Sequence, residues 1–178
     1  LYKDIQQRCG GEIYIGVVGP VRTGKSTFIK RFMDIMVLPN MLDVYEKERA
    51  VDELPQSAGG KTVTTTEPKF IPKEAAKLTL GEGMAAKVRL IDCVGYMVEG
   101  AGGHMENDAE RMVKTPWSAE EIPFTQAAEI GTRKVINDHS TIGIVVTCDG
   151  SFGDIERASY VPAEERTIKE LKHLRKPF

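Results

Sequence analysis

The chain has 178 residues, of which 41% are hydrophobic and 28% charged, and this length and composition predict one compact domain with a sizeable buried core. Its formal net charge of −2, with basic residues scattered along the chain, argues against nucleic acid as the main partner. The three widely spaced cysteines suit a reducing cytoplasm, and the sequence has neither a signal-peptide core nor an apolar run long enough to span a membrane.

The first predicted elements flank a phosphate-binding loop. Residues 13–18 form an apolar run typical of a buried parallel strand. From residue 26 onward, apolar residues recur at helical spacing, and we expect these to face the core: Phe28, Ile29, Phe32, Met33 and Met36. The stretch between strand and helix matches G-x-x-x-x-G-K-[ST] and reads Gly19-Pro20-Val21-Arg22-Thr23-Gly24-Lys25-Ser26.

This motif predicts a nucleotide site formed by residues 19–27, the last of which is Thr27. Backbone N–H groups of such a loop and the helix N-terminus bind phosphates, Lys25 contacts the β- and γ-phosphates, and Ser26 binds Mg²⁺. The alternative is a glycine-rich turn with a solvated lysine.

A threonine cluster follows two less distinctive segments. The first helix should end near residues 38–40, because a proline disfavours helical geometry just before it. Residues 41–54 predict a surface helix, and residues 55–61 a flexible loop. A hydroxyl among Thr62, Thr64, Thr65 and Thr66 would then bind Mg²⁺ or the γ-phosphate. The residues themselves do not choose among the four, since threonines ahead of a strand at 68–71 are also simply good β formers.

The next strands end in an acid. Residues 77–80 and 87–91 read as a hairpin around a turn at 81–83, and the second strand runs into Asp92. An apolar strand ending in Asp is the Walker B arrangement, in which the carboxylate holds Mg²⁺. With Gly95 it forms D-x-x-G, whose glycine N–H would bind the γ-phosphate. The alternative is that Asp92 only caps a strand.

The second half of the chain continues a β-α-β alternation. Residues 98–124 are expected to be an irregular insertion in which Trp117 packs rather than binds. A helix at 125–138 and a strand at 142–147 follow, and Asp149 is expected in a turn rather than at the nucleotide. Pro162 is expected to open the final helix, with an inner face formed by Ile168, Leu171 and Leu174.

Several segments together resemble one family, the stage IV sporulation protein A family of spore coat morphogenetic ATPases in endospore-forming bacteria. They are GPVRTGKSTFIKRFM, DELPQSAGGKTVTTTEPKF, RLIDCVGY, KTPW, IPFTQAAEIGTRKVI and HSTIGIVVTCDGSFGDI. The resemblance covers essentially the whole chain. It implies an α/β fold of the translation-factor GTPase-like P-loop NTPase type, with a mostly parallel sheet, one antiparallel hairpin strand and helices on both faces.

The resemblance also implies an activity. Its members hydrolyse ATP with Mg²⁺, and hydrolysis drives self-assembly of the coat basement layer on the mother-cell face of the outer forespore membrane. A small amphipathic anchor protein provides membrane contact, which is therefore indirect, and other coat proteins are partners. Lys25 corresponds to the Walker A lysine, Asp92 to the Walker B acid, and Thr65 and Thr66 to the sensors that couple hydrolysis to polymerisation.

The chain departs from the GTPase pattern in its last residues. No N/T-K-x-D base reader follows, so we expect residues 1–178 to be an incomplete ATPase domain without the later strands and assembly domains. We expect water to attack the γ-phosphate, with Lys25 and Mg²⁺ neutralising charge. Arg22 would contribute charge to the same site, make contact across a polymer interface, or remain solvated. Two alternatives are a regulatory GTPase and a structural module that uses bound nucleotide only as a staple.

Overall fold

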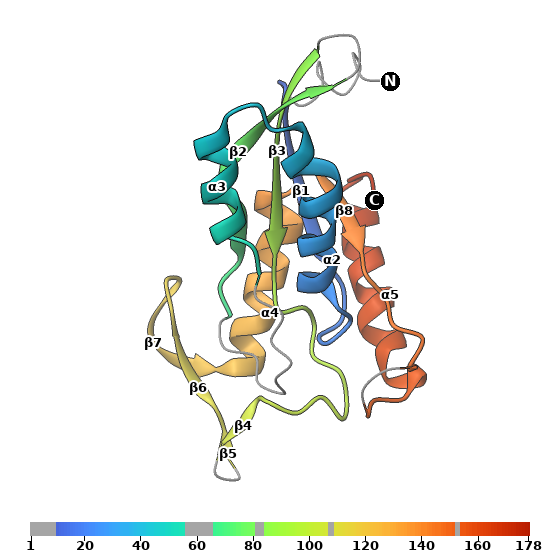
Figure 1. Cartoon of the computed structure of the whole chain (residues 1–178). Helices are drawn as coiled ribbons and strands as arrows, with labels where there is room; N and C mark the ends of the chain where they lie inside the picture. The colour runs from blue at the N-terminus through green and yellow to red at the C-terminus, as the bar shows by residue number, and fades with distance from the viewer. Residues whose placement is uncertain (1–9, 56–65, 81–83, 107–108, 152–153) are drawn as a thin grey trace.

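The main sheet is mostly parallel. The computed structural model describes residues 10–55, 66–80, 84–106, 109–151 and 154–178 (Figure 1). Four strands form the main sheet in the order β2-β3-β1-β8, with bounds β1 Glu12–Val18, β2 Lys69–Leu80, β3 Met84–Asp92 and β8 Ile142–Val145. Strand β1 pairs in parallel with β3 and β8, whereas β2 and β3 are antiparallel. The expected parallel sheet with one antiparallel hairpin strand is confirmed.

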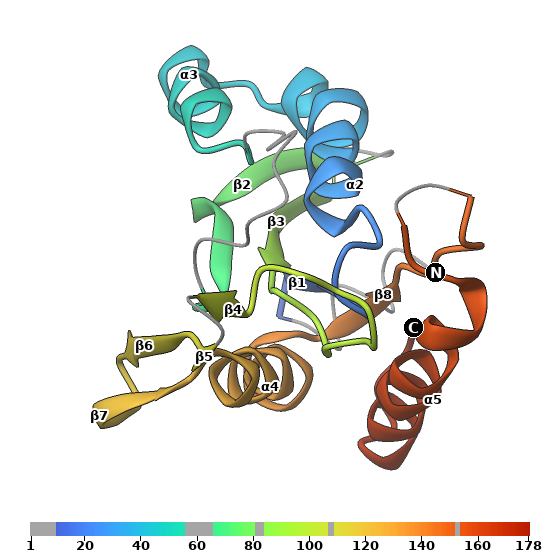
Figure 2. The same ribbon diagram turned by 90° about the horizontal axis from the view of Figure 1, so that it is seen from below.

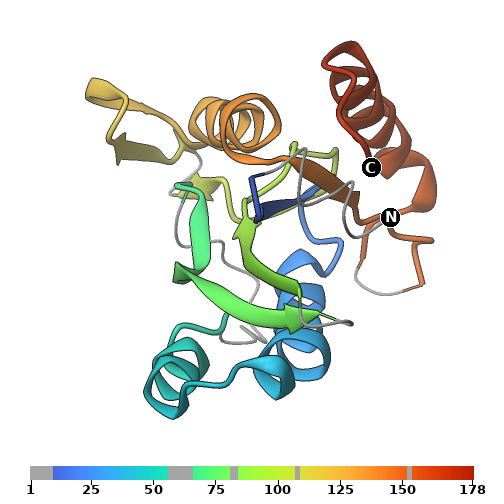
Figure 3. The same ribbon diagram turned by 90° about the horizontal axis from the view of Figure 1, so that it is seen from above.

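Helices cover both faces of this sheet, as Figures 2 and 3 show. On one face lie α2, Lys25–Phe32, and α3, Val44–Asp52. The other face carries α4, Phe124–Lys134, and α5, Arg157–His173. The chain is thus a three-layer α/β arrangement with the sheet in the middle.

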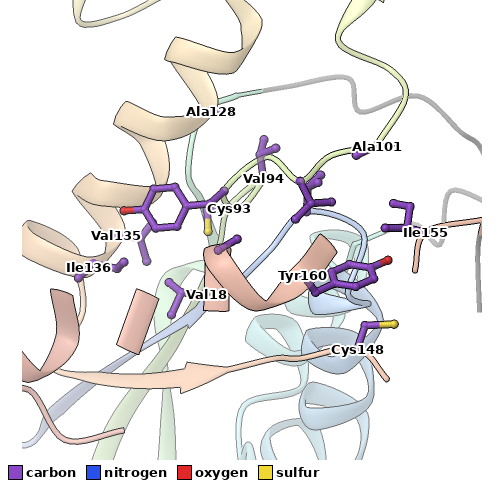
Figure 4. Packing of buried hydrophobic residues seen from close by; sticks show 14 of the residues in the cluster. Val18, Cys93, Val94, Ala101, Ala128, Val135, Ile136, Cys148, Ile155 and Tyr160 are labelled. Atoms are coloured by element: carbon purple, nitrogen blue, oxygen red, sulfur yellow. The ribbon is translucent and has the colours of Figure 1, made fainter. Parts of the chain in front are cut away.

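Each face of the sheet has its own apolar core. Under α2 and α3, Ile29 and Leu90 are fully buried. Under α4 and α5, Phe124, Tyr160 and Leu171 are at most 1% exposed. Figure 4 shows part of this second core between the end of β3, α4 and α5. The sheet is therefore fixed from both sides by hydrophobic burial.

The first helix ends near its proline as predicted, but its last turns are not α-helical. It continues as a π turn, Met33–Val37, and a 3₁₀ turn, Leu38–Asn40. Hydrogen bonds in a π turn span five residues, which rotates the following side chains away from the α-helical pattern. Met36, expected in the core, is 53% exposed, and Val37 is buried at 1%. The prediction for Met36 was therefore wrong.

The predicted surface helix and the strands after it differ in their bounds. Asp43 is the N-cap of α3, and its Oδ1 accepts the Glu46 N–H at 2.8 Å. Ala50 is the one buried residue of this helix. The strands expected at 68–71 and 77–80 are one strand, β2, whose register with β3 shifts between Ile71 and Ala76. Pro72 lies in this interruption and has no N–H for the ladder. The turn expected at 81–83 lies outside the described residues.

The insertion at 98–124, expected to be irregular, is irregular only in part: residues 98–104 have no helix or strand. It contains two small hairpins formed by β4, Met105–Glu106, with β5, Ala109–Glu110, and by β6, Met112–Thr115, with β7, Ser118–Pro123. Strands β4 and β5 have two residues each, which is too few for an alternation of apolar and polar residues to show in the sequence. Trp117 is half-buried, and the Lys134 Nζ atom lies 5.9 Å from its ring centroid.

Helix α4 and strand β8 match the prediction, and the final helix does not. The predicted helix at 125–138 is α4 plus a π turn, Val135–His139. Helix α5 begins at Arg157, so Pro162 lies inside it and not at its start. Pro162 is exposed, and as the sixth residue of α5 it has no N–H to donate to the Ala158 carbonyl oxygen. Leu171 is buried as expected, but Leu174 follows the last helical residue and is 38% exposed.

None of the helices in the described part of the chain has both the length and the apolar character that crossing a bilayer requires.

The π turn leads to a stability prediction with a matched pair of variants. Met33 is fully buried and Met36 is 53% exposed, although both fit the α-helical pattern. Met33→Ala should lower the free energy of unfolding by roughly 2–5 kcal/mol, because it leaves a cavity in the core. Met36→Ala should change it by less than about 0.5 kcal/mol. Urea unfolding followed by circular dichroism measures both, and equal losses would contradict the rotation at the π turn.

Candidate functional site

The loop between β1 and α2 makes a tight turn around the helix N-terminus. Gly19 has a φ of +133°, and a Cβ atom there would lie 2.4 Å from the Val146 carbonyl oxygen. Arg22 and Gly24 also have positive φ, and Gly24 is the N-cap of α2. The free N–H groups at the start of a helix favour anionic ligands. The loop therefore has the backbone that a phosphate site needs.

The other loop residues support this turn in different ways. Pro20 and Val21 are buried, and the Thr23 hydroxyl donates to the Pro20 carbonyl oxygen at 3.0 Å. Arg22 is half-buried, and Thr27 is exposed on the first turn of α2.

Lys25 is buried within the loop that it follows. Its side chain is 4% exposed, and Nζ donates to the Pro20 carbonyl oxygen at 2.5 Å. Burial away from water disfavours the charged amine and lowers the pKa of Lys25, against the opposing effect of the nearby Asp92. A cation held in this way is desolvated and lies at the helix N-terminus.

Ser26 and Asp92 meet although 66 positions separate them in the chain. The Ser26 hydroxyl donates to Asp92 Oδ2 at 2.6 Å. Asp92 is 9% exposed, and its other oxygen, Oδ1, is buried without a hydrogen-bond partner. Desolvation raises the pKa of the Asp92 carboxyl, while the bond from Ser26 and the charge of Lys25 act in the opposite direction.

The residues after Asp92 are joined to the loop through their backbone. The Tyr96 N–H donates to the Gly19 carbonyl oxygen at 3.2 Å, and the Val21 N–H donates to the Tyr96 carbonyl oxygen at 2.9 Å. Gly95 has a φ of +96°, and a Cβ atom there would lie 2.4 Å from the Gly19 carbonyl oxygen and 2.6 Å from Lys25 Nζ. Only glycine fits between the loop and the lysine amine.

Of the predicted sensor threonines, the structure describes Thr66. It is 4% exposed, and its carbonyl oxygen would lie 2.5 Å from a Cβ atom at Gly131 of α4. Thr62, Thr64 and Thr65 lie outside the described residues. The segment at Thr66 therefore rests closely against α4.

Thr132 is a site residue that the sequence reasoning missed. It lies on α4 next to Gly131, is fully buried, and its Oγ1 accepts the Gly95 N–H at 3.1 Å. The signal in the sequence was the Gly-Thr pair inside a strongly predicted helix, since both residues are poor helix formers.

The remaining acidic, metal-binding and cysteine candidates among the described residues do not add to this site. The exposed Asp149 accepts the Ser151 N–H at 2.9 Å and forms the expected turn. Across the described ranges, no three His, Cys, Asp or Glu residues are grouped so that they could hold a metal ion. Cys93 and Cys148 are buried free thiols, while Cys9 lies outside the described residues.

The residues present fit a magnesium ion. Mg²⁺ prefers oxygen ligands and binds proteins through one or two carboxylates together with substrate phosphates. The unpartnered Asp92 Oδ1 and the Ser26 hydroxyl are oxygen donors of this kind beside a phosphate-type loop. A set of three or more protein acids is not required for such a site.

Comparison with known proteins identifies the relatives of this chain. Residues 1–178 match the family model described as stage IV sporulation protein A, ATPase domain. The chain is 58% identical to stage IV sporulation protein A of Bacillus subtilis (strain 168), 57% identical to that of Bacillus anthracis and 58% identical to that of Clostridioides difficile (strain 630).

These matches cover the whole chain but only part of each relative. All 178 residues are aligned, and they span 36% of the length of each of the three proteins. No solved structure matches the chain.

Burial at the site leads to a prediction for Cys93. Desolvation raises the pKa of the Cys93 thiol from 9.0 to about 11, so at pH 8 its thiolate fraction should be about 100-fold lower than that of an unperturbed thiol. In a Cys9→Ala variant, iodoacetamide should leave Cys93 and Cys148 unmodified in the native chain and alkylate both in urea. Mass spectrometry reads out the labelling, and rapid native labelling of Cys93 would show that the end of β3 opens to solvent.

Proposed function

The chain belongs to the family of stage IV sporulation protein A ATPase domains, and from that premise we propose that it binds ATP with Mg²⁺ and hydrolyses it to ADP and phosphate. One observation carries the proposal. The Ser26 hydroxyl bonds Asp92 at 2.6 Å, leaving the other carboxylate oxygen unpartnered close to the buried Lys25. A desolvated cation, a hydroxyl and a free carboxylate oxygen at a helix N-terminus are what a magnesium–triphosphate ligand requires.

Each residue has a proposed role. Lys25 and the loop of residues 19–27 bind the phosphates, and Ser26 and Asp92 hold the metal. When bound, Mg²⁺ neutralises charge on the phosphate oxygens. The chain's own contribution is to position the nucleotide and exclude water from Lys25, and the proposal assigns no side chain as a base. For Arg22 we propose no catalytic role; it contributes a positive charge to the loop.

Thr65, Thr66 and Gly95 are proposed as the groups that respond to the terminal phosphate. The family resemblance supports the two threonines. The closeness of Gly95 to the Lys25 amine supports the third, because its backbone lies beside the group that would contact the β- and γ-phosphates. The same arrangement of strand, loop, helix and antiparallel hairpin supports a P-loop NTPase of the translation-factor GTPase-like type.

The role in the cell is also a proposal, because the chain spans 36% of its relatives' length. We propose that residues 1–178 are the ATPase domain of a longer protein that polymerises into the basement layer of the spore coat. This layer would form in the mother cell, on the outer forespore membrane, with other coat proteins and a small amphipathic anchor protein as partners. The printed name of the relatives, a sporulation protein, supports this setting.

The first test concerns binding. Lys25→Ala should abolish tight binding of ATP, because it removes the cation from the phosphate loop. Isothermal titration with a non-hydrolysable ATP analogue and Mg²⁺ measures the loss. Lys172→Ala, a lysine exposed on α5, is the matched control and should bind as the parent does.

Three results would contradict the proposal in different ways. Undiminished binding by Lys25→Ala would exclude the loop as the site. A competition titration in which GTP displaces the analogue far better than ATP would identify a GTPase instead. ATP-dependent thermal stabilisation without phosphate release above the Lys25→Ala background would indicate a structural use of the nucleotide.

The second test concerns turnover. The double variant Thr65→Ala with Thr66→Ala should keep its affinity for ATP but lose roughly 10²-fold in the rate of hydrolysis, the scale of a lost transition-state donor. Phosphate release under single-turnover conditions measures this rate. Thr79→Ala, exposed on β2, is the control for a threonine lost elsewhere. Equal hydrolysis by the double variant would remove the sensor assignment.

A further inference from the structure

Helix α4 supports both of the segments proposed to respond to nucleotide. Gly131 allows the Thr66 carbonyl oxygen to approach within 2.5 Å of where a Cβ would lie, and the next residue, Thr132, accepts the Gly95 N–H at 3.1 Å. Thr66 and Gly95 come from different parts of the chain, before β2 and after β3. Two adjacent helical residues therefore contact both segments.

The Thr132 hydroxyl is engaged across the interface and not with its own helix. A buried threonine on a helix commonly donates to the carbonyl four residues before it. Thr167 on α5 does this, with Oγ1 donating to the Ala163 carbonyl oxygen at 2.8 Å. Thr132, equally fully buried, instead accepts from Gly95 and also interacts with the Cys93 thiol. Leaving this buried hydroxyl without a hydrogen-bond partner would cost free energy.

The Gly95 N–H is a single donor that is bonded to Thr132 Oγ1 and lies close to the Cys93 sulfur in the nucleotide-free chain. Its backbone lies against Lys25, since a Cβ atom at Gly95 would be 2.6 Å from Nζ. A phosphate held by Lys25 would therefore compete for the N–H with the Thr132 oxygen. Phosphate oxygens are charged acceptors and form stronger hydrogen bonds than a neutral hydroxyl.

We propose that Thr132 is a positioning residue that holds the Gly95 N–H in the nucleotide-free chain and must give it up to a terminal phosphate. The inference rests on the proposed function, in which Gly95 responds to that phosphate. Thr132 thereby lowers the affinity for a triphosphate relative to a diphosphate, because only the triphosphate has to displace it. Its role is to set how sharply the site distinguishes ATP from ADP.

Thr132→Val tests this, since valine keeps the shape of threonine and removes the acceptor. In the nucleotide-free variant the Gly95 N–H loses its oxygen acceptor and keeps only the Cys93 sulfur, which is a weak acceptor, so a terminal phosphate gains more from bonding it. The affinity for a non-hydrolysable ATP analogue should therefore rise about tenfold relative to the affinity for ADP. Thr132→Ser, which keeps the hydroxyl, should leave the ratio unchanged.

Thr167→Val is the matched control for lost stability. It removes an equally buried helical hydroxyl without touching Gly95, so it should lower the unfolding temperature and leave the ratio of the two affinities as in the parent. Isothermal titration of each variant with the analogue and with ADP gives the ratio. In the nucleotide-free proteins, hydrogen exchange of the Gly95 amide should be fast in Thr132→Val and slow in Thr132→Ser and Thr167→Val.

The parent chain provides a measurement that needs no variant to fold. Its Gly95 amide proton resonance should shift on addition of the ATP analogue and not on addition of ADP, because only the analogue replaces the hydroxyl as acceptor. An unchanged resonance, or a ratio of affinities that Thr132→Val does not alter, overturns the inference while the proposed function stands. Absence of Lys25-dependent binding by the parent overturns both.

Discussion

The parallel pairing of β1 with β3 is the constraint on which the rest of the structure depends. Its register sets Val17 opposite Asp92, so the strand that leads into the phosphate loop ends beside the acid. Val17 and Ile91 are fully buried, and cores on both faces of the sheet hold this register in place. Hydrophobic burial far from any ligand thus brings Ser26 within 2.6 Å of a carboxylate that lies 66 positions away.

The site holds two ionisable side chains, Lys25 and Asp92, away from water, where a charge costs free energy. Lys25 is 4% exposed and Asp92 is 9% exposed. Burial lowers the pKa of Lys25 and raises the pKa of Asp92, so it favours the neutral form of each side chain. Such groups are destabilising unless they are paired, and the rest of the fold offsets their cost. A ligand that carries negative phosphates and a cation would supply partners to both. This links the electrostatics of the site to the class of ligand proposed for it.

The segment after Asp92 connects the loop to the helices on the far face of the sheet. Tyr96 is bonded to Gly19 through its backbone, and its hydroxyl donates to Glu170 of α5 at 2.5 Å. The Arg166 guanidinium lies 4.1 Å from the Tyr96 ring centroid and pairs with Glu129 of α4 at 2.5 Å. With the contact of α4 to Gly95, these interactions join the loop, α4 and α5 into one polar network.

The sequence alone determined the local elements: the strand, loop and helix at the motif and the strand that ends at Asp92, because apolar periodicity and glycine spacing report the conformation of neighbouring residues. The tertiary structure decided what depends on packing between distant segments. A π turn leaves Met36 exposed, and Pro162 lies inside a helix instead of at its start. Thr132 is fully buried and accepts the Gly95 N–H. Such contacts depend on register, twist and the volume left by other elements, and no pattern within a few neighbouring residues carries that information.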